Sequence, residues 1–94
     1  MRTIEWSNAI KKDYRRIKAS SHRTQDVDQL LEAVLDLLVE DQPLPENYRD
    51  HALVGNWKGH RECHLKPDLL LIYNTEEPDK LCLIRLGSHS ELFR

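Results

Sequence analysis

Three histidines, one aspartate and one arginine in the second half of the chain have side chains suited to metal-free cleavage of RNA. An imidazole has an unperturbed pKa of about 6.5, so near neutral pH one ring can accept a proton while another donates one. A guanidinium can face the charged phosphorane, and the RNA supplies its own 2′-hydroxyl as nucleophile. Spacing alone does not establish that these groups converge. The candidates are His51, His64, Asp68, Arg85 and His89.

A metal site would be the competing chemistry. Cys63, His64, His60 and Asp68 include possible ligands. Cys63 and His64 are adjacent on a predicted strand, however, so their side chains point to opposite faces. The sequence contains neither a CxxC nor an HExxH pattern. We therefore predict a site without a metal or any other cofactor.

Arg85 interrupts an otherwise apolar strand, and a charge in such a place needs a partner or a ligand. The pattern supports equally an internal ion pair with Asp68 or Glu62 and a phosphate-binding role. Four polar side chains alternate onto one face of an earlier predicted strand, a pattern as typical of a solvated face as of a site. They are Lys58, His60, Glu62 and His64.

The 94 residues predict one domain, 1–94, with a modest core. The start of the chain has no apolar signal region, and no stretch approaches the ~18 apolar residues that a membrane span needs. Cys63 and Cys82 are expected to be reduced thiols. These features predict a soluble, cytoplasmic protein with no membrane partner.

The net charge of −2 hides an uneven distribution. Basic side chains dominate residues 1–25, and acidic ones dominate residues 26–50. A basic face can bind phosphates on a protein that is acidic overall, although such a row alone is more typical of a solvated helix surface. The basic row comprises Lys11, Lys12, Arg15, Arg16 and Lys18.

The N-terminal residues predict a strand followed by a helix. Residues 2–6 alternate polar and apolar side chains, which is the pattern of a short strand. Ser7 is a suitable N-cap for a helix over about 8–20. The apolar stripe of this helix consists of Ile10, Tyr14 and Ile17.

A second helix is predicted from a cap at Thr24 or Asp26 to about Glu40, before prolines that cannot continue it. Both helices are long enough to form an antiparallel hairpin. The loop 41–55 then delivers His51. The row opposite the apolar face of the second helix is acidic and consists of Asp28, Glu32, Asp36 and Glu40.

The second half predicts three strands, 57–65, 69–74 and 81–86, joined by short turns that favour antiparallel neighbours. The last two strands are apolar on both faces, so we expect them at the centre of the sheet. A short tail carries His89 and Phe93. The predicted fold is α+β, with an N-terminal strand and a two-helix hairpin packed on a twisted, mainly antiparallel sheet.

Residues 50–68 read DHALVGNWKGHRECHLKPD. This segment resembles the DHxLxGxWKGxRxxHxxPD signature of the YafQ branch of the RelE superfamily of bacterial type II toxins. LLIY at 70–73 and RLGSHSELF at 85–93 resemble two further motifs of that branch. Together with the helical hairpin before them, the resemblance covers essentially the whole chain.

The resemblance implies a RelE-like microbial RNase fold and an mRNA interferase, an endoribonuclease that enters the ribosomal A site and cuts translated mRNA. It implies cleavage through the RNA 2′-hydroxyl, a 2′,3′-cyclic phosphate product and inhibition of translation. It also implies a cognate antitoxin protein that binds and silences the toxin.

The family's functional residues can be carried over by motif position. We expect His89 to be the general acid, Arg85 to face the phosphorane, and either Asp68 or His64 to be the base. His51 would position the phosphate, and the aromatic ring would stack on a base or pack the tail. The residues carried over are His51, His64, Asp68, Arg85, His89 and Phe93.

We expect the basic row of the first helix to meet ribosomal RNA, with the acidic second helix facing outward. Leu69 departs from the Trp that is frequent at this position in the branch, and leucine cannot stack on a nucleotide, so codon preference is expected to differ. The predicted RNA or ribosome contacts are Lys11, Lys12, Arg15, Arg16, Lys18, Lys58 and Phe93.

Two other functions stay open. ParE-type relatives share the fold but bind DNA gyrase without cutting RNA, although histidines at RNase-like positions disfavour this function. A decayed toxin that only binds its antitoxin is the other alternative, suggested by Leu69 and the low pI.

Overall fold

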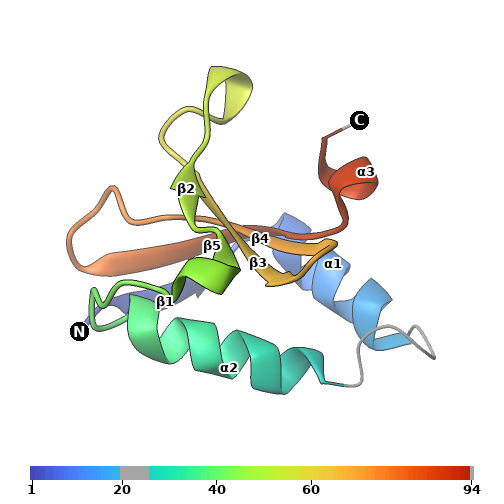
Figure 1. Cartoon of the computed structure of the whole chain (residues 1–94), viewed down its shortest axis with the longest axis horizontal. Helices are drawn as coiled ribbons and strands as arrows, with labels where there is room; N and C mark the ends of the chain where they lie inside the picture. The colour runs from blue at the N-terminus through green and yellow to red at the C-terminus, as the bar shows by residue number, and fades with distance from the viewer. Residues whose placement is uncertain (20–25, 94) are drawn as a thin grey trace.

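In the computed structural model, residues 1–19 and 26–93 are described. They form a five-stranded sheet with helices on both faces (Figure 1). This α+β arrangement, mainly antiparallel, confirms the predicted fold class. The elements in chain order are β1 Thr3–Trp6, α1 Asn8–Ala19, α2 Val27–Leu38, the 3₁₀ turn η1 Glu46–Tyr48, β2 His51–Ala52, the 3₁₀ turn η2 Gly55–Trp57, β3 Arg61–Lys66, β4 Leu69–Asn74, β5 Lys80–Gly87 and α3 His89–Leu92.

The strand order is β1-β5-β4-β3-β2, with β4 at the centre. β1 is parallel to β5, and the other neighbours are antiparallel because short turns connect them. Residues 69–73 of β4 are all buried, as expected for a strand that is apolar on both faces.

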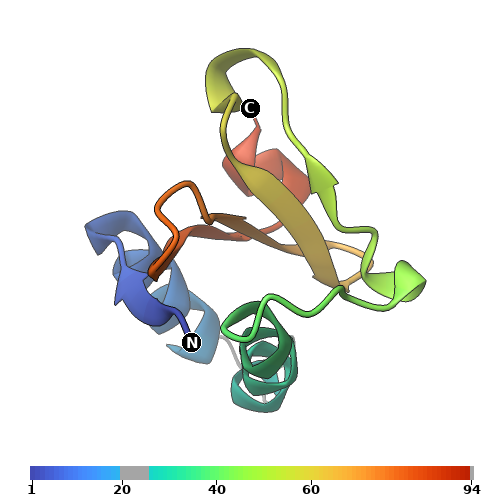
Figure 2. The ribbon, with the colours of Figure 1, turned by 90° about the vertical axis from the view of Figure 1, so that its left-hand side faces the viewer.

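The sheet buries apolar side chains on both faces. The helix face of the sheet, which packs against α1 and α2, carries Leu71 and Tyr73 of β4 in the main core. The opposite surface, here called the site face, carries Leu70 and Ile72, against which Leu92 of α3 packs. Figure 2 shows α2 on one side of the sheet and α3 on the other.

Ser7 begins α1 as predicted. Its Oγ accepts the Ile10 N–H at 3.0 Å, which satisfies one of the unpaired donors of the first turn. The same hydroxyl donates to the Ile84 carbonyl of β5 at 2.7 Å, so the cap also fastens the helix to the sheet. At α2, Asp26 is the N-cap residue, as one of the two predicted alternatives has it, but its side chain makes no capping hydrogen bond. The alternative, Thr24, lies outside the described residues.

The strand predicted over 57–65 begins only at Arg61 and runs to Lys66. Gly59 lies within the predicted strand and has a φ of 91°, and Gly55 just before it has a φ of 68°; these left-handed glycines turn the backbone away from an extended path. Lys58 and His60 therefore do not lie on a strand, while Glu62 and His64 share the site face as predicted. Every helix within 1–19 and 26–93 is too short or too polar to cross a bilayer.

A histidine cluster as the candidate active site

His51 and His64 flank the buried carboxylate of Glu62. β2 pairs with β3 so that His51 lies opposite Glu62, and His64 follows two residues later on the same face. Glu62 Oε1 lies 3.2 Å from His64 Nε2 and 3.7 Å from His51 Nε2. The Glu62 residue is 3% exposed. Glu62 was predicted to share a strand face with His64 and was an alternative partner for Arg85; the structure makes it the acid shared by two imidazoles.

The segment before His51 is fixed from the helix face of the sheet. Asp50 accepts hydrogen bonds from the Tyr73 hydroxyl and, at 3.1 Å, from Arg61 Nη2. Because the next side chain of an extended backbone points the opposite way, this anchor presents His51 on the site face. His51 Nδ1 bonds to the Arg49 carbonyl at 2.6 Å; a carbonyl only accepts, so Nδ1 carries a proton and Nε2 faces Glu62.

His89 joins the cluster from the first turn of α3. Asp68, in the turn between β3 and β4, accepts the His89 backbone N–H at 3.0 Å and lies 3.5 Å from its ring Nδ1. The His89 ring is 5.8 Å from that of His64, which is 6.5 Å from that of His51. Three histidines from β2, β3 and α3 therefore form one continuous row.

Aromatic rings border this row. Phe93 lies 5.9 Å from the His89 ring and 6.2 Å from that of Trp57, between ring centroids. Trp57 also meets the His60 ring edge-on at 5.5 Å. Phe93 is 38% exposed, so its ring lies at the surface beside the histidines. Among the residues that the structure describes, His60 Nδ1 is buried without a hydrogen-bond partner.

A bulge in β5 places Arg85 on the site face. Leu83 and Leu86 belong to the main core, so strict alternation from Leu83 would point Arg85 at the helices. The pairing shifts at this point: Tyr73 lies opposite Leu83, and Ile72 lies opposite Arg85. Ile84 is the extra residue, and bulges of this kind re-aim the side chains that follow them.

Arg85 forms a two-pronged ion pair with Asp13 of α1. Arg85 Nε and Nη2 donate to the two oxygens of this carboxylate at 2.7 and 3.1 Å. Of the two alternatives for Arg85, the structure shows the internal ion pair, but with Asp13 instead of Asp68 or Glu62. β4 separates Arg85 from Glu62 by two strand spacings, about 10 Å. Asp13 occupies the buried face of α1 between Ile10 and Ile17, and an acid in an apolar stripe was the available signal.

Ion pairs divide the predicted basic row of α1. Arg16 Nη1 lies 3.1 Å from Asp13 Oδ1, and Lys18 Nζ lies 2.7 Å from Asp28 of α2. Lys12 and Lys58 are exposed. The row therefore does not form one uniform phosphate-binding surface.

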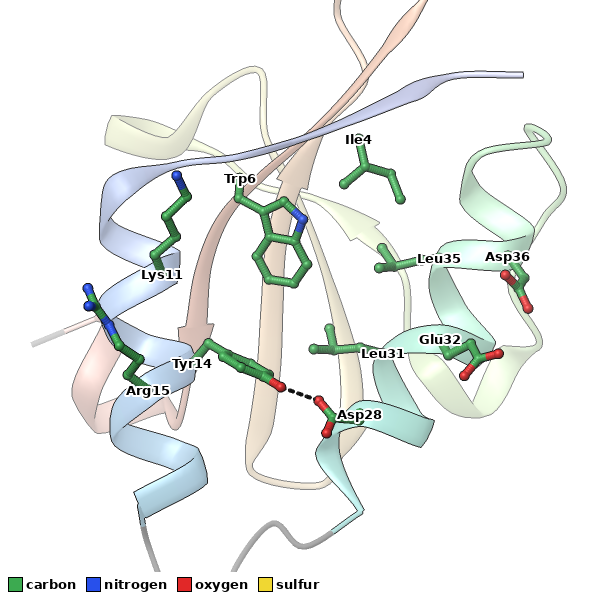
Figure 3. Close-up of a pocket in the computed structure, with 10 residues that line it drawn as sticks. All are labelled: Ile4, Trp6, Lys11, Tyr14, Arg15, Asp28, Leu31, Glu32, Leu35 and Asp36. Atoms are coloured by element: carbon green, nitrogen blue, oxygen red, sulfur yellow. Dashed lines mark hydrogen bonds between the residues drawn. The ribbon is translucent and has the colours of Figure 1, made fainter.

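Lys11 and Arg15 lie on α1 at the rim of a groove of about 750 Å³ between β1, α1 and α2, and the Arg15 side chain points away from its centre (Figure 3). The expectation that the acidic helix faces away from the basic row is wrong, because three of its acids line the same groove. The groove contains none of the histidines, so the candidate site is a surface row outside it. The residues that line the groove are Ile4, Trp6, Lys11, Tyr14, Arg15, Asp28, Leu31, Glu32, Leu35 and Asp36.

The chain matches the family model described as the bacterial toxin of type II toxin–antitoxin system, YafQ, over residues 2–94. The mRNA interferase toxin YafQ of Escherichia coli K12 is 40% identical over 93 residues, covering 98% of this chain and 96% of that protein. The crystal structure of the E. coli DinJ–YafQ complex contains a chain 36% identical, with a TM-score of 0.84 and full coverage of both chains.

A crystal structure of a metal-bound toxin from Helicobacter pylori is 46% identical, with a TM-score of 0.85, and covers 99% of this chain and 100% of that one. In the present chain, no three His, Cys, Asp or Glu side chains among residues 1–19 and 26–93 are arranged to hold a metal ion.

The family match and these relatives extend over nearly the entire sequence and over both halves of the fold. The motif that carries three of the candidate site residues also lies within the matched region. The chain belongs to the YafQ family of bacterial toxins of type II toxin–antitoxin systems.

Proposed function

We propose that the chain is an endoribonuclease that cuts translated mRNA at the ribosomal A site and so inhibits translation. One observation carries this proposal: the imidazoles of His51, His64 and His89 converge on one surface from three separate elements. A protein that acts only by binding another protein has no need of such a row of proton-transfer groups. The E. coli relative named an mRNA interferase toxin supports the same class of activity.

His64 is the better of the two candidates for the general base. Asp68 already accepts the backbone N–H of His89 and lies beside its ring, so it acts as the group that orients the general acid. His64 lies between His51 and His89 and is held by Glu62. His64 can then take the proton of the RNA 2′-hydroxyl as its oxygen bonds to phosphorus, while protonated His89 gives its own proton to the departing 5′ oxygen. The P–O5′ bond breaks and a 2′,3′-cyclic phosphate remains.

Arg85 of β5 supplies positive charge on the side of the site opposite His51 of β2. Asp13 occupies its Nε and Nη2, so contact with the phosphorane uses the remaining amino group, Nη1. The Arg85 side chain is 28% exposed, which leaves it accessible to RNA bound on the site face. His51 then contacts the phosphate at the other side, and Phe93 stacks on an adjacent base.

We further propose a cytoplasmic location, no cofactor, and an antitoxin protein as the inhibitory partner. Structures of the E. coli DinJ–YafQ toxin–antitoxin complex support the last of these. Lys11, Lys12, Arg15 and Lys58 remain candidates for ribosome contact because they are exposed cations.

Mapping of RNA 5′ ends after pulsed expression tests the proposal, with His89→Ala as the matched inactive variant. We expect new ends inside open reading frames with the unaltered chain and none with His89→Ala. Upstream fragments should carry cyclic phosphate ends, and in a purified ribosome assay cleavage by protein dialysed against chelator should be unchanged. Growth arrest with intact mRNA and lost supercoiling would instead indicate a gyrase inhibitor. An absence of toxicity would indicate a chain that only binds antitoxin.

A further inference from the structure

Asp13 is a buried acid at the outer edge of β5, on the far side of the sheet from the histidine row. β1 pairs with Lys80–Leu83 and then ends, and α1 lies beside the rest of this edge. Asp13 is 2% exposed there, and its Oδ2 accepts the Leu86 N–H at 3.0 Å. The carboxylate therefore takes the place of a missing strand at the point where β5 carries Arg85.

Each Asp13 oxygen accepts two hydrogen bonds. Oδ2 accepts from Leu86 N and from Arg85 Nε, while Oδ1 accepts from Arg85 Nη2 and, at 3.1 Å, from Arg16 Nη1. An amide in this position would turn an NH₂ group toward one of its donors. Burial alone would raise the pKa of Asp13, but hydrogen bonds from Arg85 and the Leu86 backbone outweigh it and hold the pKa below its ordinary value.

A second set of contacts leads from Asp13 to α3. Arg16, which bonds to Asp13, also places its Nε 3.3 Å from Glu91 Oε2. The other Glu91 oxygen accepts the Ser88 N–H at 2.8 Å, and Ser88 Oγ accepts the Glu91 N–H, forming the capping box that begins α3. A four-residue helix has little stability of its own. Its orientation, and with it His89, therefore depends on such contacts.

The backbone at Gly87, between Arg85 and Ser88, is closely enclosed by Arg16 and Glu91. A Cβ atom at Gly87 would lie 2.9 Å from Glu91 Oε1 and 3.2 Å from Arg16 Nη2. A side chain there would have to displace one of these groups. The end of β5 and the start of α3 are thus held as one unit against α1.

We propose that Asp13 is a positioning residue that aligns Arg85 and, through Arg16 and Glu91, the helix that carries His89. This inference rests on the proposed RNA cleavage, because those two side chains are its cation and its acid. Asp13 itself contacts neither RNA nor the reacting atoms. Displacement of a catalytic group by about 1 Å lowers the reaction rate on the order of a hundredfold. Loss of Asp13 should therefore lower kcat rather than weaken RNA binding.

Asp13→Asn tests the proposal in a purified cleavage assay on translated mRNA. We expect kcat to fall at least tenfold, while KM changes less than twofold. Ile10→Val is the matched control, because Ile10 is fully buried on the same face of α1, about one turn earlier, and belongs to the core alone. The control should cleave at the unaltered rate. Equal losses in both variants would show a merely structural role and overturn the proposal.

A double-mutant cycle separates action through Arg85 from general damage. In an Arg85→Ala background, where the cation is already gone, Asp13→Asn should cost much less than it does in the unaltered chain. The same fold-loss in both backgrounds would mean that Asp13 acts independently of Arg85, which contradicts the inference.

Amide hydrogen exchange in the RNA-free protein distinguishes failure of this inference from failure of the proposed function. We expect the Ser88 and His89 amides to lose at least tenfold protection in Asp13→Asn and Arg16→Gln and to keep it in Ile10→Val. If the unaltered chain does not cut RNA, the function proposal fails, and retained protection in Asp13→Asn would separately overturn the positioning role.

Discussion

Replacing Tyr73 by phenylalanine should weaken the anchor that presents His51. Tyr73 is 1% exposed, and its hydroxyl donates to Asp50. Phenylalanine keeps the ring and its packing, and Asp50 keeps its bonds from Arg61, so the loss is close to that of one hydrogen bond. We expect the free energy of unfolding at pH 7 to fall by about 1–2 kcal/mol. For a chain of this size, each kcal/mol lowers the melting temperature by roughly 4–8 °C.

The pH dependence of this loss gives a sharper test. Burial first, and then the bond to Asp50, raise the pKa of Tyr73 above its ordinary value, which is about 10. The folded chain therefore keeps the phenolic proton at pH values where the unfolded chain loses it, so this stabilisation is complete below pH 10 and is lost as the pH rises. The unaltered chain should lose about 1.4 kcal/mol relative to Tyr73→Phe by roughly pH 11.

Urea unfolding followed by circular dichroism at pH 7, 9, 10 and 11 measures both effects. The advantage of tyrosine should be constant to pH 9 and nearly vanish near pH 11. Cys63, whose pKa burial raises to about 12, titrates in both proteins, and its contribution cancels in the comparison. Equal stability at pH 7, or curves that stay parallel through pH 11, would refute a buried hydrogen bond from Tyr73 as the anchor.

Three further predictions concern single groups. Glu62→Gln keeps the side-chain volume but removes the charge beside His64. We expect the cleavage rate to fall at least tenfold while the free energy of unfolding stays within about 1 kcal/mol of the unaltered chain. Unchanged cleavage would show that Glu62 is not part of the site. Because Cys63 is fully buried, iodoacetamide at pH 8 should label Cys82 well before Cys63 in the folded chain, and equal rates would contradict this burial. Burial would raise the pKa of Asp13, but its hydrogen bonds outweigh burial and lower that pKa. The ionised Asp13 carboxylate therefore stabilises the folded chain fully above about pH 3.9, and this stabilisation is lost as the pH falls further. Asp13→Asn should lack this loss of stability in acid, measured by urea unfolding.

The predicted arrangement of the sheet rested on local patterns that the structure confirms. Residues 69–73 are apolar on both faces, and β4 is central and buried on both. Ser7 is a good cap by residue type, and it caps α1. The prediction was wrong at residues 57–60, where Gly59 with its positive φ interrupts an alternation of side chains that otherwise favours a strand.

The histidine row was predictable in residue type, and the family motif placed its members. Its geometry was not, because periodicity carries no information on which distant side chains meet. Arg85 and Asp13 are 72 residues apart, and the bulge at Ile84 that turns Arg85 to the site face has no signature in the sequence pattern. The buried acid on α1 was the one signal available, and it pointed to Asp13 rather than to its partner.

The parallel pairing of β1 with β5 has a kinetic consequence. In this register Ile4 lies opposite Leu81. Most of the chain must therefore be closed into a loop before the hydrogen bonds between β1 and β5 can form. Contacts between residues so far apart in sequence slow folding, because the entropy of closing the loop is lost before the contacts can stabilise the chain. Arg85 lies two residues beyond this ladder. Folding should therefore be slow for so small a protein, and the cation should reach its place only as the last long-range contacts form.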